Sequence, residues 1–158
     1  ELGHYAAVRL QGGSVRGLHL TISGGEMPLD QRHPLTYAGE LIAILAGPAA
    51  NLLLALAALR LGSGREEGWL LAGLSLCLGW FNLLPVWPLD GGRALMLILT
   101  GFLPHDTAAA GVRVCSLALG FGLLTGGLSL LVRGGGATLA LMGGWLLACQ
   151  FRGRKVGK

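Results

Sequence analysis

Charged residues are scarce in this chain, which has 158 residues and only 13% Asp, Glu, Lys and Arg. A soluble domain usually carries about 25% of these residues. Hydrophobic residues make up 53% of the chain, and its mean hydropathy is +0.63. This composition excludes an ordinary soluble domain and indicates a membrane protein. Glycines are numerous, at 28, and are scattered through apolar segments where small residues let helices approach closely.

Cysteine is also rare. The three cysteines, Cys77, Cys115 and Cys149, fall in separate apolar segments without paired spacing. Such spacing excludes a disulfide framework and a thiolate zinc site. We expect them to be small packed residues, because a free cysteine behaves as a buried hydrophobe.

The basic residues do not gather on one soluble face, which argues against nucleic-acid binding despite a net charge of +4. They sit at the ends of apolar segments and therefore indicate membrane topology. If the spans alternate, nine of the twelve fall on the side that follows Leu10 (Arg9, Arg16, Arg32, Arg93, Arg113, Arg152, Arg154, Lys155 and Lys158). By the positive-inside rule, this side is expected to be cytoplasmic, and the chemistry is expected to lie toward it.

Four long intervals contain no charged residue, and each has 18 to 22 residues. About 20 apolar residues cross a bilayer. We therefore predict an all-α polytopic membrane protein, a bundle of about four complete transmembrane helices within a single domain over residues 1–158. The predicted spans are Glu40–Leu61, Trp69–Leu89, Gly111–Val132 and Ala137–Cys149. Glu1 to about Leu10 is expected to be the end of a further helix that is truncated at its N-terminus, because the chain begins with Glu.

Residues 11–35 interrupt the helical pattern. Glycines punctuate this segment, and Leu18, Leu20 and Ile22 alternate with polar residues. Alternation of this kind predicts a short strand, one arm of a β-hairpin-like segment. An open sheet edge must avoid lipid, so the segment is expected at the membrane interface or beside a cavity. There it could pair with an extended substrate, although an ordered surface loop is the alternative.

The stretch from Phe81 to Arg93 combines features that are costly in a membrane helix. Pro85 and Pro88 each remove a backbone donor, and Asp90 places a carboxylate at membrane depth. Because Gly91 and Gly92 follow at once, we expect the helix to open there and Asp90 to point inward. Ala94–Leu103 should finish this helix or lead into a cytoplasmic loop that contains Pro104, His105 and Asp106.

Two residues at the start of the chain are of the types that serve as ligand and base in catalytic zinc sites. Glu1 and His4 are three residues apart and share one face of a helix. Residues 1–4 match the last four residues of a His-Glu-x-x-His motif. This motif supplies two zinc ligands one turn apart, with the base between them. The first His is not in this sequence. Elsewhere, Pro48 predicts a kink, and Asn51 either joins two helices or serves the site.

Three motifs together resemble the site-2 protease family of intramembrane zinc metalloproteases. They are Glu1-Leu2-Gly3-His4, Gly47-Pro48-x-x-Asn51 and Asn82-x-x-Pro85-x-x-Pro88-Leu89-Asp90-Gly91-Gly92. The resemblance covers about residues 1–103, and the third motif is the most specific. The chain is most similar to the compact bacterial branch, which includes the sporulation protease that processes a pro-sigma factor.

The resemblance implies a role for each matching residue. Glu1 would be the general base, and His4 and Asp90 would be ligands of the zinc cofactor. Asn51 and Asn82 would orient substrate or stabilise the oxyanion, and Pro85, Pro88, Gly91 and Gly92 would open the helix. The reaction implied is hydrolysis of a peptide bond in or near a transmembrane segment. The substrate would be a pro-sigma factor, an anti-sigma factor or a remnant signal peptide.

Because these 158 residues contain only two of the ligands, we expect them to bind zinc poorly and to be inactive, whereas the parent protein is active. Two other functions stay open. A non-catalytic membrane protein could use the same fold to bind transmembrane helices. A small transporter is the other alternative, since an intramembrane Asp and a broken helix are also typical of transporters.

Overall fold

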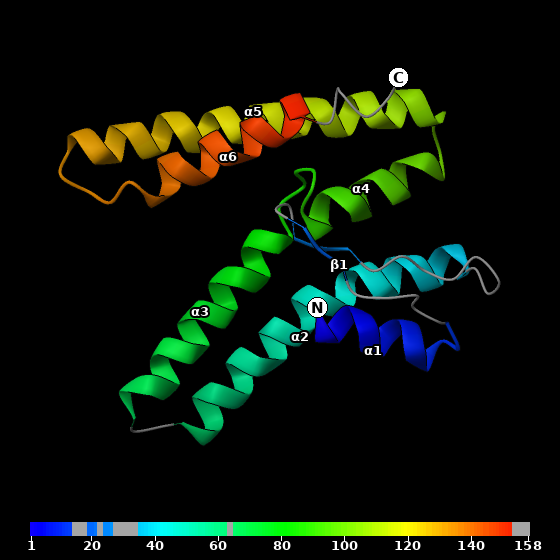
Figure 1. The fold of residues 1–158 in the computed structure, drawn as a ribbon, viewed down its shortest axis with the longest axis horizontal. Coiled ribbons are helices and arrows are strands. Elements are labelled where there is room, and N and C mark those ends of the chain that lie inside the picture. The colour runs from blue at the N-terminus through cyan, green and yellow to red at the C-terminus, as the bar shows by residue number, and fades with distance from the viewer. Residues whose placement is uncertain (14–18, 22–23, 27–34, 63–64, 153–158) are drawn as a thin grey trace. The chain divides into compact units, whose positions relative to one another are not determined.

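The computed structural model describes residues 1–13, 19–21, 24–26, 35–62 and 65–152 (Figure 1). These residues form six helices and one pair of short strands, in agreement with the predicted helical fold. The elements in chain order are α1 (Leu2–Leu10), β1 (His19–Thr21), β2 (Gly24–Glu26), α2 (Tyr37–Leu61), α3 (Glu66–Asn82), α4 (Asp90–Thr100), α5 (His105–Val132) and α6 (Thr138–Arg152). Leu18 and Ile22 of the expected strand, and the basic residues Arg16, Arg32, Arg154, Lys155 and Lys158, lie outside the described residues.

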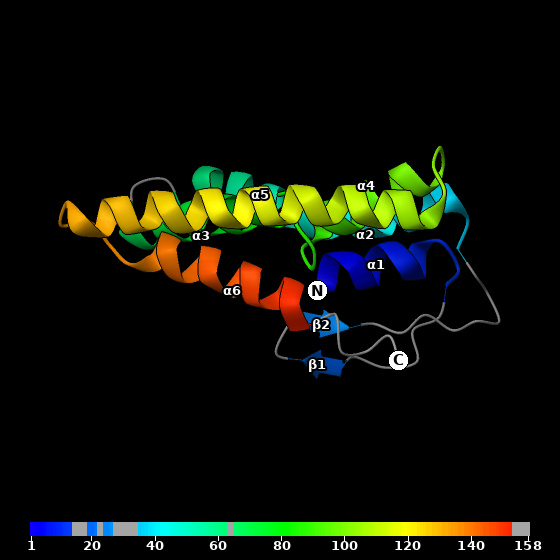
Figure 2. The same cartoon turned by 90° about the horizontal axis from the view of Figure 1, so that it is seen from above.

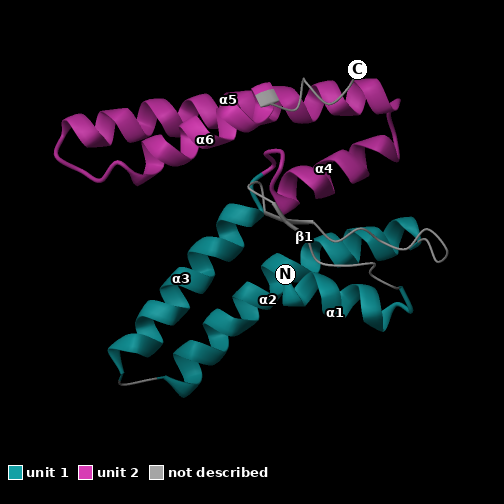
Figure 3. Ribbon diagram, in the orientation of Figure 1, with its two compact units in different colours: residues 1–84 teal, residues 85–158 magenta. Residues whose placement is uncertain are grey.

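The chain divides into two compact units, Glu1–Leu84 and Pro85–Lys158, each described by itself (Figure 3). In the first unit, α1 packs on α2, and α2 packs on α3. In the second, α4 packs on α5, and α5 packs on α6. Within the segment predicted as a hairpin, β1 and β2 are antiparallel, with His19 opposite Glu26 and Thr21 opposite Gly24 (Figure 2).

Helix α1 has the bounds expected from the sequence and lies very close to α2. Gly3 approaches the backbone of Ala46 and the side chain of Ala50 so closely that a Cβ at position 3 would overlap both. At the other end of α1, the Gln11 amide donates hydrogen bonds to the Ala7 and Gly39 carbonyls, at 3.0 and 3.1 Å. The two helices are therefore joined at both ends of α1.

Small residues also join α2 and α3 into a helical hairpin. Ala55, Ala58, Ala72, Ser75 and Gly79 are buried along it, and Gly62 meets Gly68 at its turn. Thr36 caps the start of α2 by accepting a hydrogen bond from the Gly39 N–H, at 3.1 Å. Pro48 lies inside α2, and the ribbon of this helix changes direction partway along (Figure 1).

Two helices, α2 and α5, are long and apolar enough to cross a membrane. In the most apolar 18-residue stretch of each, only 28% and 17% of the residues are buried. Large apolar side chains cover the outer faces, with Leu53, Trp80 and Val114 each about two-thirds exposed (67%, 68% and 66%). Apolar surface of this extent is unfavourable in water and is typical of contact with lipid.

The expectation that the cysteines are packed is wrong for two of them. Cys77 and Cys115 are exposed, and Cys149 is half-buried. Cys77 and Cys115 lie on helix faces that the described residues leave exposed. In such a chain, an apolar environment for a thiol is supplied by lipid as well as by the protein interior.

The predicted span Trp69–Leu89 is too long at its end, because α3 stops at Asn82. Residues 83–89 form turns and bends instead of helix. Pro85 and Pro88 cannot donate to the helical ladder, and each disfavours helical backbone at the preceding residue. Both prolines lie in this interruption, whereas Gly91 and Gly92 lie inside the first turn of α4 and are buried. The helical structure is therefore interrupted before Asp90, and a new helix begins at Asp90.

The region after Asp90 also differs from expectation. Residues Asp90–Thr100 form a separate helix, α4, rather than the end of the preceding span. His105 and Asp106 begin α5 instead of lying in a loop. Their side chains are highly exposed, with the His105 Nδ1 3.9 Å from the Asp106 Oδ1, so they form a solvated pair, not part of a ligand set.

Helices α5 and α6 approach each other at glycines other than those that the spacing suggests. Gly120 contacts Leu147, and the backbones of Gly127 and Gly143 meet those of Ala140 and Leu124. By contrast, a Cβ at Gly122 or Gly126 would meet nothing within 4 Å among the described residues. Leu146 and Ser116 have no exposed surface, so they form the centre of this interface.

Replacing Gly92 with alanine should destabilise the second unit. An added Cβ would overlap the Val86 carbonyl, and backbone cannot move aside as a flexible side chain can. Overpacking of this kind costs about 1–3 kcal/mol. Thermal unfolding of the detergent-purified protein should show a lower Tm for Gly92→Ala. The control Gly122→Ala, which meets open space, should leave the Tm unchanged or raise it slightly. Equal effects of the two substitutions would contradict this packing.

Candidate functional site

Glu1 and His4 stand at the start of α1, where the local structure is what the motif requires. The Tyr5 N–H donates to the Glu1 carbonyl at 3.0 Å, which closes the first helical turn. Side chains three residues apart on a helix lie on the same face. Glu1 is exposed and His4 is half-buried. The pair therefore combines an accessible carboxylate with an imidazole held against the neighbouring helix.

The His4 ring has a defined position on α2. Its Nδ1 lies 2.8 Å from the Ala43 carbonyl oxygen. Since a carbonyl only accepts, Nδ1 carries the proton and donates this bond, and in the neutral ring Nε2 then bears the lone pair. The ring packs on Gly47, where any Cβ would overlap it. A backbone carbonyl on one ring nitrogen is the arrangement that orients metal-ligating histidines.

Asn51 lies one turn beyond Gly47 on α2. Its Cβ is 3.4 Å from the position that a Cβ of Gly79 would occupy, so it packs against α3. Its amide makes no hydrogen bond to any other residue in the described part of the chain. The contact between the helices at this point is therefore a close approach of Asn51 to the backbone of Gly79.

Asn82 is the last residue of α3, one turn beyond Gly79. The side chains of residues 79 and 82 fall on the same face of this helix. Asn82 is half-buried, and within the described residues its amide also makes no hydrogen bond. The first unit thus carries Glu1, His4, Asn51 and Asn82 on three helices that pack in succession.

Asp90 is the first residue of α4 and is half-buried. The turn before it is closed by the Leu89 N–H, which donates to the Val86 carbonyl at 2.8 Å, and contains a cis peptide bond between Trp87 and Pro88. A carboxylate in the first turn of a helix is favoured by the helix dipole. On the next turn, the Arg93 guanidinium lies 5.9 Å from the centre of the Trp87 ring.

The donor set suits zinc. Imidazole nitrogen and carboxylate oxygen are both common ligands of catalytic zinc, with a further carboxylate as base. His4 and Glu1 belong to the first unit and Asp90 to the second. Residues 1–13, 19–21, 24–26, 35–62 and 65–152 contain no cluster of three or more His, Cys, Asp or Glu side chains that could hold a metal.

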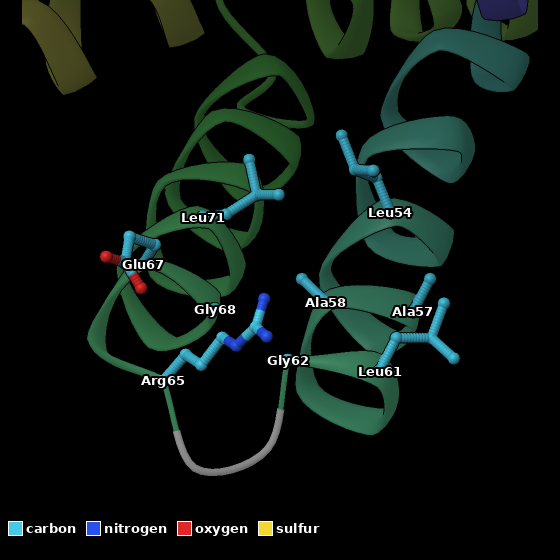
Figure 4. Close-up of a pocket in the computed structure, with 9 residues that line it drawn as sticks. All are labelled: Leu54, Ala57, Ala58, Leu61, Gly62, Arg65, Glu67, Gly68 and Leu71. Atoms are coloured by element: carbon cyan, nitrogen blue, oxygen red, sulfur yellow. The ribbon is translucent and has the colours of Figure 1, made fainter.

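A groove between α2 and α3 is distinct from these residues. It has a volume of about 750 Å³ and lies at the turn of the hairpin, where Arg65 extends between the helices (Figure 4). Its lining is mostly apolar and includes Leu54, Ala58 and Leu71. None of Glu1, His4, Asn51, Asn82 and Asp90 lines it.

Sequence reasoning missed two polar residues in the second unit, Ser116 and Gln150. Both contact the backbone of Trp87, three residues before Asp90. A signal was present, since each is an isolated polar residue in an apolar helix, and a buried polar group needs a partner. The sequence could not show that this partner is the proline-containing segment.

Comparisons with known proteins agree with the motifs. The model of peptidase family M50 matches residues 67–125. A zinc metalloprotease of Methanocaldococcus jannaschii is 32% identical over 137 residues, covering 79% of this chain and 40% of that protein. Stage IV sporulation protein FB of Bacillus subtilis is 30% identical over 112 residues, covering 68% and 39%. The chain therefore spans about two-fifths of the length of these relatives.

A solved structure is also similar, that of the site-2 protease from Methanocaldococcus jannaschii. It superposes with a TM-score of 0.72 at 25% sequence identity, over 96% of this chain and 70% of that one. At 96% coverage, the similarity extends well beyond the family-model match, which contains neither α1 nor α6.

Replacing Gly47 with alanine should displace the His4 ring and break its hydrogen bond to Ala43. If His4 is a ligand, zinc affinity should fall at least tenfold, the usual effect of losing an orienting contact. The measurement is chelator competition on purified protein that includes any residues encoded before Glu1. Gly73→Ala, which meets nothing within 4 Å, is the control and should bind zinc normally. Normal zinc binding by Gly47→Ala would show that the position of His4 does not matter for the metal.

Proposed function

Because this chain belongs to the site-2 protease family, peptidase family M50, we propose that it is part of a zinc-dependent intramembrane endopeptidase. The observation that carries the proposal is the His4 ring on α2. Its Nδ1 donates to the Ala43 carbonyl and so holds the ring in one orientation on α2, which is how metal-ligating histidines are oriented. Glu1 accompanies it one turn away on the same helix.

We propose that His4 and Asp90 are zinc ligands and that Glu1 is the general base. Bound zinc would supply Lewis acidity, which activates water and polarises the scissile carbonyl. The Glu1 carboxylate would take the proton of the attacking water and deliver it to the departing amine. This role suits an exposed carboxylate, because it must exchange protons with water and substrate.

Asn51 and Asn82 are proposed to hold the substrate backbone or to stabilise the oxyanion. Both are half-buried, and neither amide makes a hydrogen bond within the described part of the chain. Each side-chain amide carries two N–H donors, which suit a carbonyl oxygen. An amide donor aimed at a developing oxyanion contributes strongly to catalysis when water is excluded.

For the membrane, we propose four spans, α2, α3, α5 and α6, with α1 as the end of another. The 17 residues of α3 give a helix of about 26 Å at 1.5 Å per residue, a little less than the hydrocarbon thickness. The proposed orientation places Arg9, Arg93 and Arg113 toward the cytoplasm, with β1 and β2 at that interface. The two units together would form one protease domain.

The proposed substrates are membrane proteins or membrane-associated peptides, with pro-sigma and anti-sigma factors as the first candidates. Exposed apolar faces along α2, α3 and α5 suit a site that is approached from the bilayer. Addition of an extended substrate to the edge of the β1–β2 pair would present its backbone without side-chain specificity.

Two substitutions test the chemistry. Glu1→Gln should abolish cleavage of a transmembrane substrate in proteoliposomes while zinc content is unchanged, because an amide cannot accept the proton. Asp90→Asn should lower zinc affinity by at least tenfold, because an amide is a poor ligand. Both should be measured on protein that includes any residues encoded before Glu1. The control Asp106→Asn changes an exposed carboxylate of the second unit and should alter neither quantity.

These variants also separate the alternatives. Cleavage by Glu1→Gln at the wild-type rate would rule out the proposed base. Absence of cleavage in every form, with tight binding of transmembrane helices, would indicate a non-catalytic protein. An ion or substrate flux that depends on Asp90 but not on Glu1 or His4 would indicate a transporter.

The 158 residues alone should hold zinc weakly and show no activity, because His4 and Asp90 are two ligands where catalytic zinc sites use three. Placing one His directly before Glu1 should raise zinc retention toward one ion per chain, whereas an Ala at the same position should not. Metal analysis after gel filtration decides between these outcomes. Tight, stoichiometric zinc in the unaltered 158 residues would contradict the assigned ligand set.

A further inference from the structure

We infer that Ser116 and Gln150 are positioning residues that hold the backbone of Trp87 from two helices and thereby fix the start of α4, where Asp90 lies. This inference rests on the proposed role of Asp90 as a zinc ligand. It assigns a function to the last two helices, which carry none of the recognised motifs. Ser116 and Gln150 together are called the Trp87 clamp.

Ser116 binds the backbone N–H of Trp87. Its hydroxyl donates to the Val112 carbonyl at 2.7 Å and accepts from the Trp87 N–H at 2.9 Å. The Ser116 side chain has no exposed surface. The buried hydroxyl thus donates one hydrogen bond within α5 and accepts one from the proline-containing segment. No water is needed to satisfy either group.

Gln150 holds the carbonyl side of the same residue. Its side-chain amide donates to the Trp87 carbonyl oxygen from α6. Trp87 therefore has both of its backbone polar groups bound by side chains, because the residues around it do not form a helix. The bond to Ser116 is part-buried and the bond to Gln150 is exposed, so the first is the costlier one to leave unmade.

The packing of α5 against α6 brings the two clamp residues to the same level. Gly120 lies one turn beyond Ser116, and Leu147 lies nearly one turn before Gln150. Gly120 and Leu147 are in direct contact. Since the helices run in opposite directions, Ser116 and Gln150 fall beside each other on the far side of this contact. The close glycine packing of the hairpin is therefore a condition for the clamp.

The clamp reaches Asp90 through three short links. The Leu89 N–H closes the turn onto Val86 at 2.8 Å, and the Arg93 N–H begins the helix on the Leu89 carbonyl at 3.0 Å. Gly92 lies directly on the Val86 carbonyl, with no room for a Cβ. A shift of Trp87 would thus move the first turn of α4. Residues that orient ligands typically change metal affinity 10- to 100-fold when they are lost.

A pair of equal-sized substitutions isolates the hydroxyl of Ser116. Ser116→Thr keeps the oxygen and Ser116→Val replaces it with a methyl group, so steric effects are matched. We expect Ser116→Val to lose at least tenfold in zinc affinity and in kcat relative to Ser116→Thr, with KM within about twofold. Hydrogen exchange at residues 84–90 should be faster in Ser116→Val alone, because the Trp87 N–H loses its acceptor. The protein used should include any residues encoded before Glu1.

Two further variants complete the experiment. Gln150→Met keeps the length of the side chain without its donor, and we expect a tenfold loss of zinc affinity here as well. Thr125→Val is the matched control: the Thr125 hydroxyl also donates to a carbonyl four residues earlier on α5, at 2.9 Å, but touches no part of the clamp. It should leave zinc affinity, kcat and exchange at residues 84–90 unchanged.

Two results would overturn the inference. The first is equal behaviour of Ser116→Val and Ser116→Thr. The second is faster exchange at residues 84–90 with unchanged zinc affinity and kcat. If Ser116→Val does not fold, Gln150→Met decides by the same measurements. Retention of zinc by Asp90→Asn would reject the proposed function itself. Loss of zinc in Asp90→Asn with normal zinc in Gln150→Met rejects only the clamp.

Discussion

Backbone hydrogen bonding in an apolar environment is the constraint on which this structure depends. Lipid offers no partner for an N–H or C=O group, and most of the residues that the structure describes are helical. The exception at residues 83–89 exists because other groups replace the missing helical bonds. A turn bond joins Leu89 to Val86, and Ser116 and Gln150 bind both sides of Trp87. An interrupted helix near Asp90 is thus possible only with the helices that follow it.

Close approach through small residues is the second feature that organises both units. Gly3 lies on Ala46, Gly47 admits the His4 ring, and Gly79 lies against Asn51. Without a hydrophobic driving force between helices in lipid, such contacts supply much of the association through van der Waals packing. At Gly47 the same contact also sets the chemistry, because it allows the imidazole to reach the Ala43 carbonyl. Packing and the orientation of the proposed ligand His4 therefore depend on the same contact.

Part of the fold could be predicted from local pattern and part could not. Charge-free intervals predict α2 to within three residues and the end of α5, because hydrophobic length is a local property, but α5 begins six residues earlier than predicted. The end of α3 was predicted seven residues too late, since the apolar run continues to Leu89 while the prolines stop the helix. Gly122 and Gly126 have the spacing of a packing motif but face open space, whereas Gly120 and Gly127 pack. Spacing alone does not tell which face of a helix meets a neighbour.

Residue types at fixed spacing are enough to predict the class of fold, the resemblance to the site-2 protease family and the candidate residues Glu1, His4, Asn51, Asn82 and Asp90. The folded structure is needed to learn which ring nitrogen of His4 carries the proton, since that depends on a carbonyl 39 residues away. It also places Gly91 and Gly92 inside the first turn of α4, with Gly92 directly on the Val86 carbonyl, and brings Ser116 and Gln150 to the backbone of Trp87. Hydrogen-bond partners distant in sequence are chosen by packing, which no local pattern records.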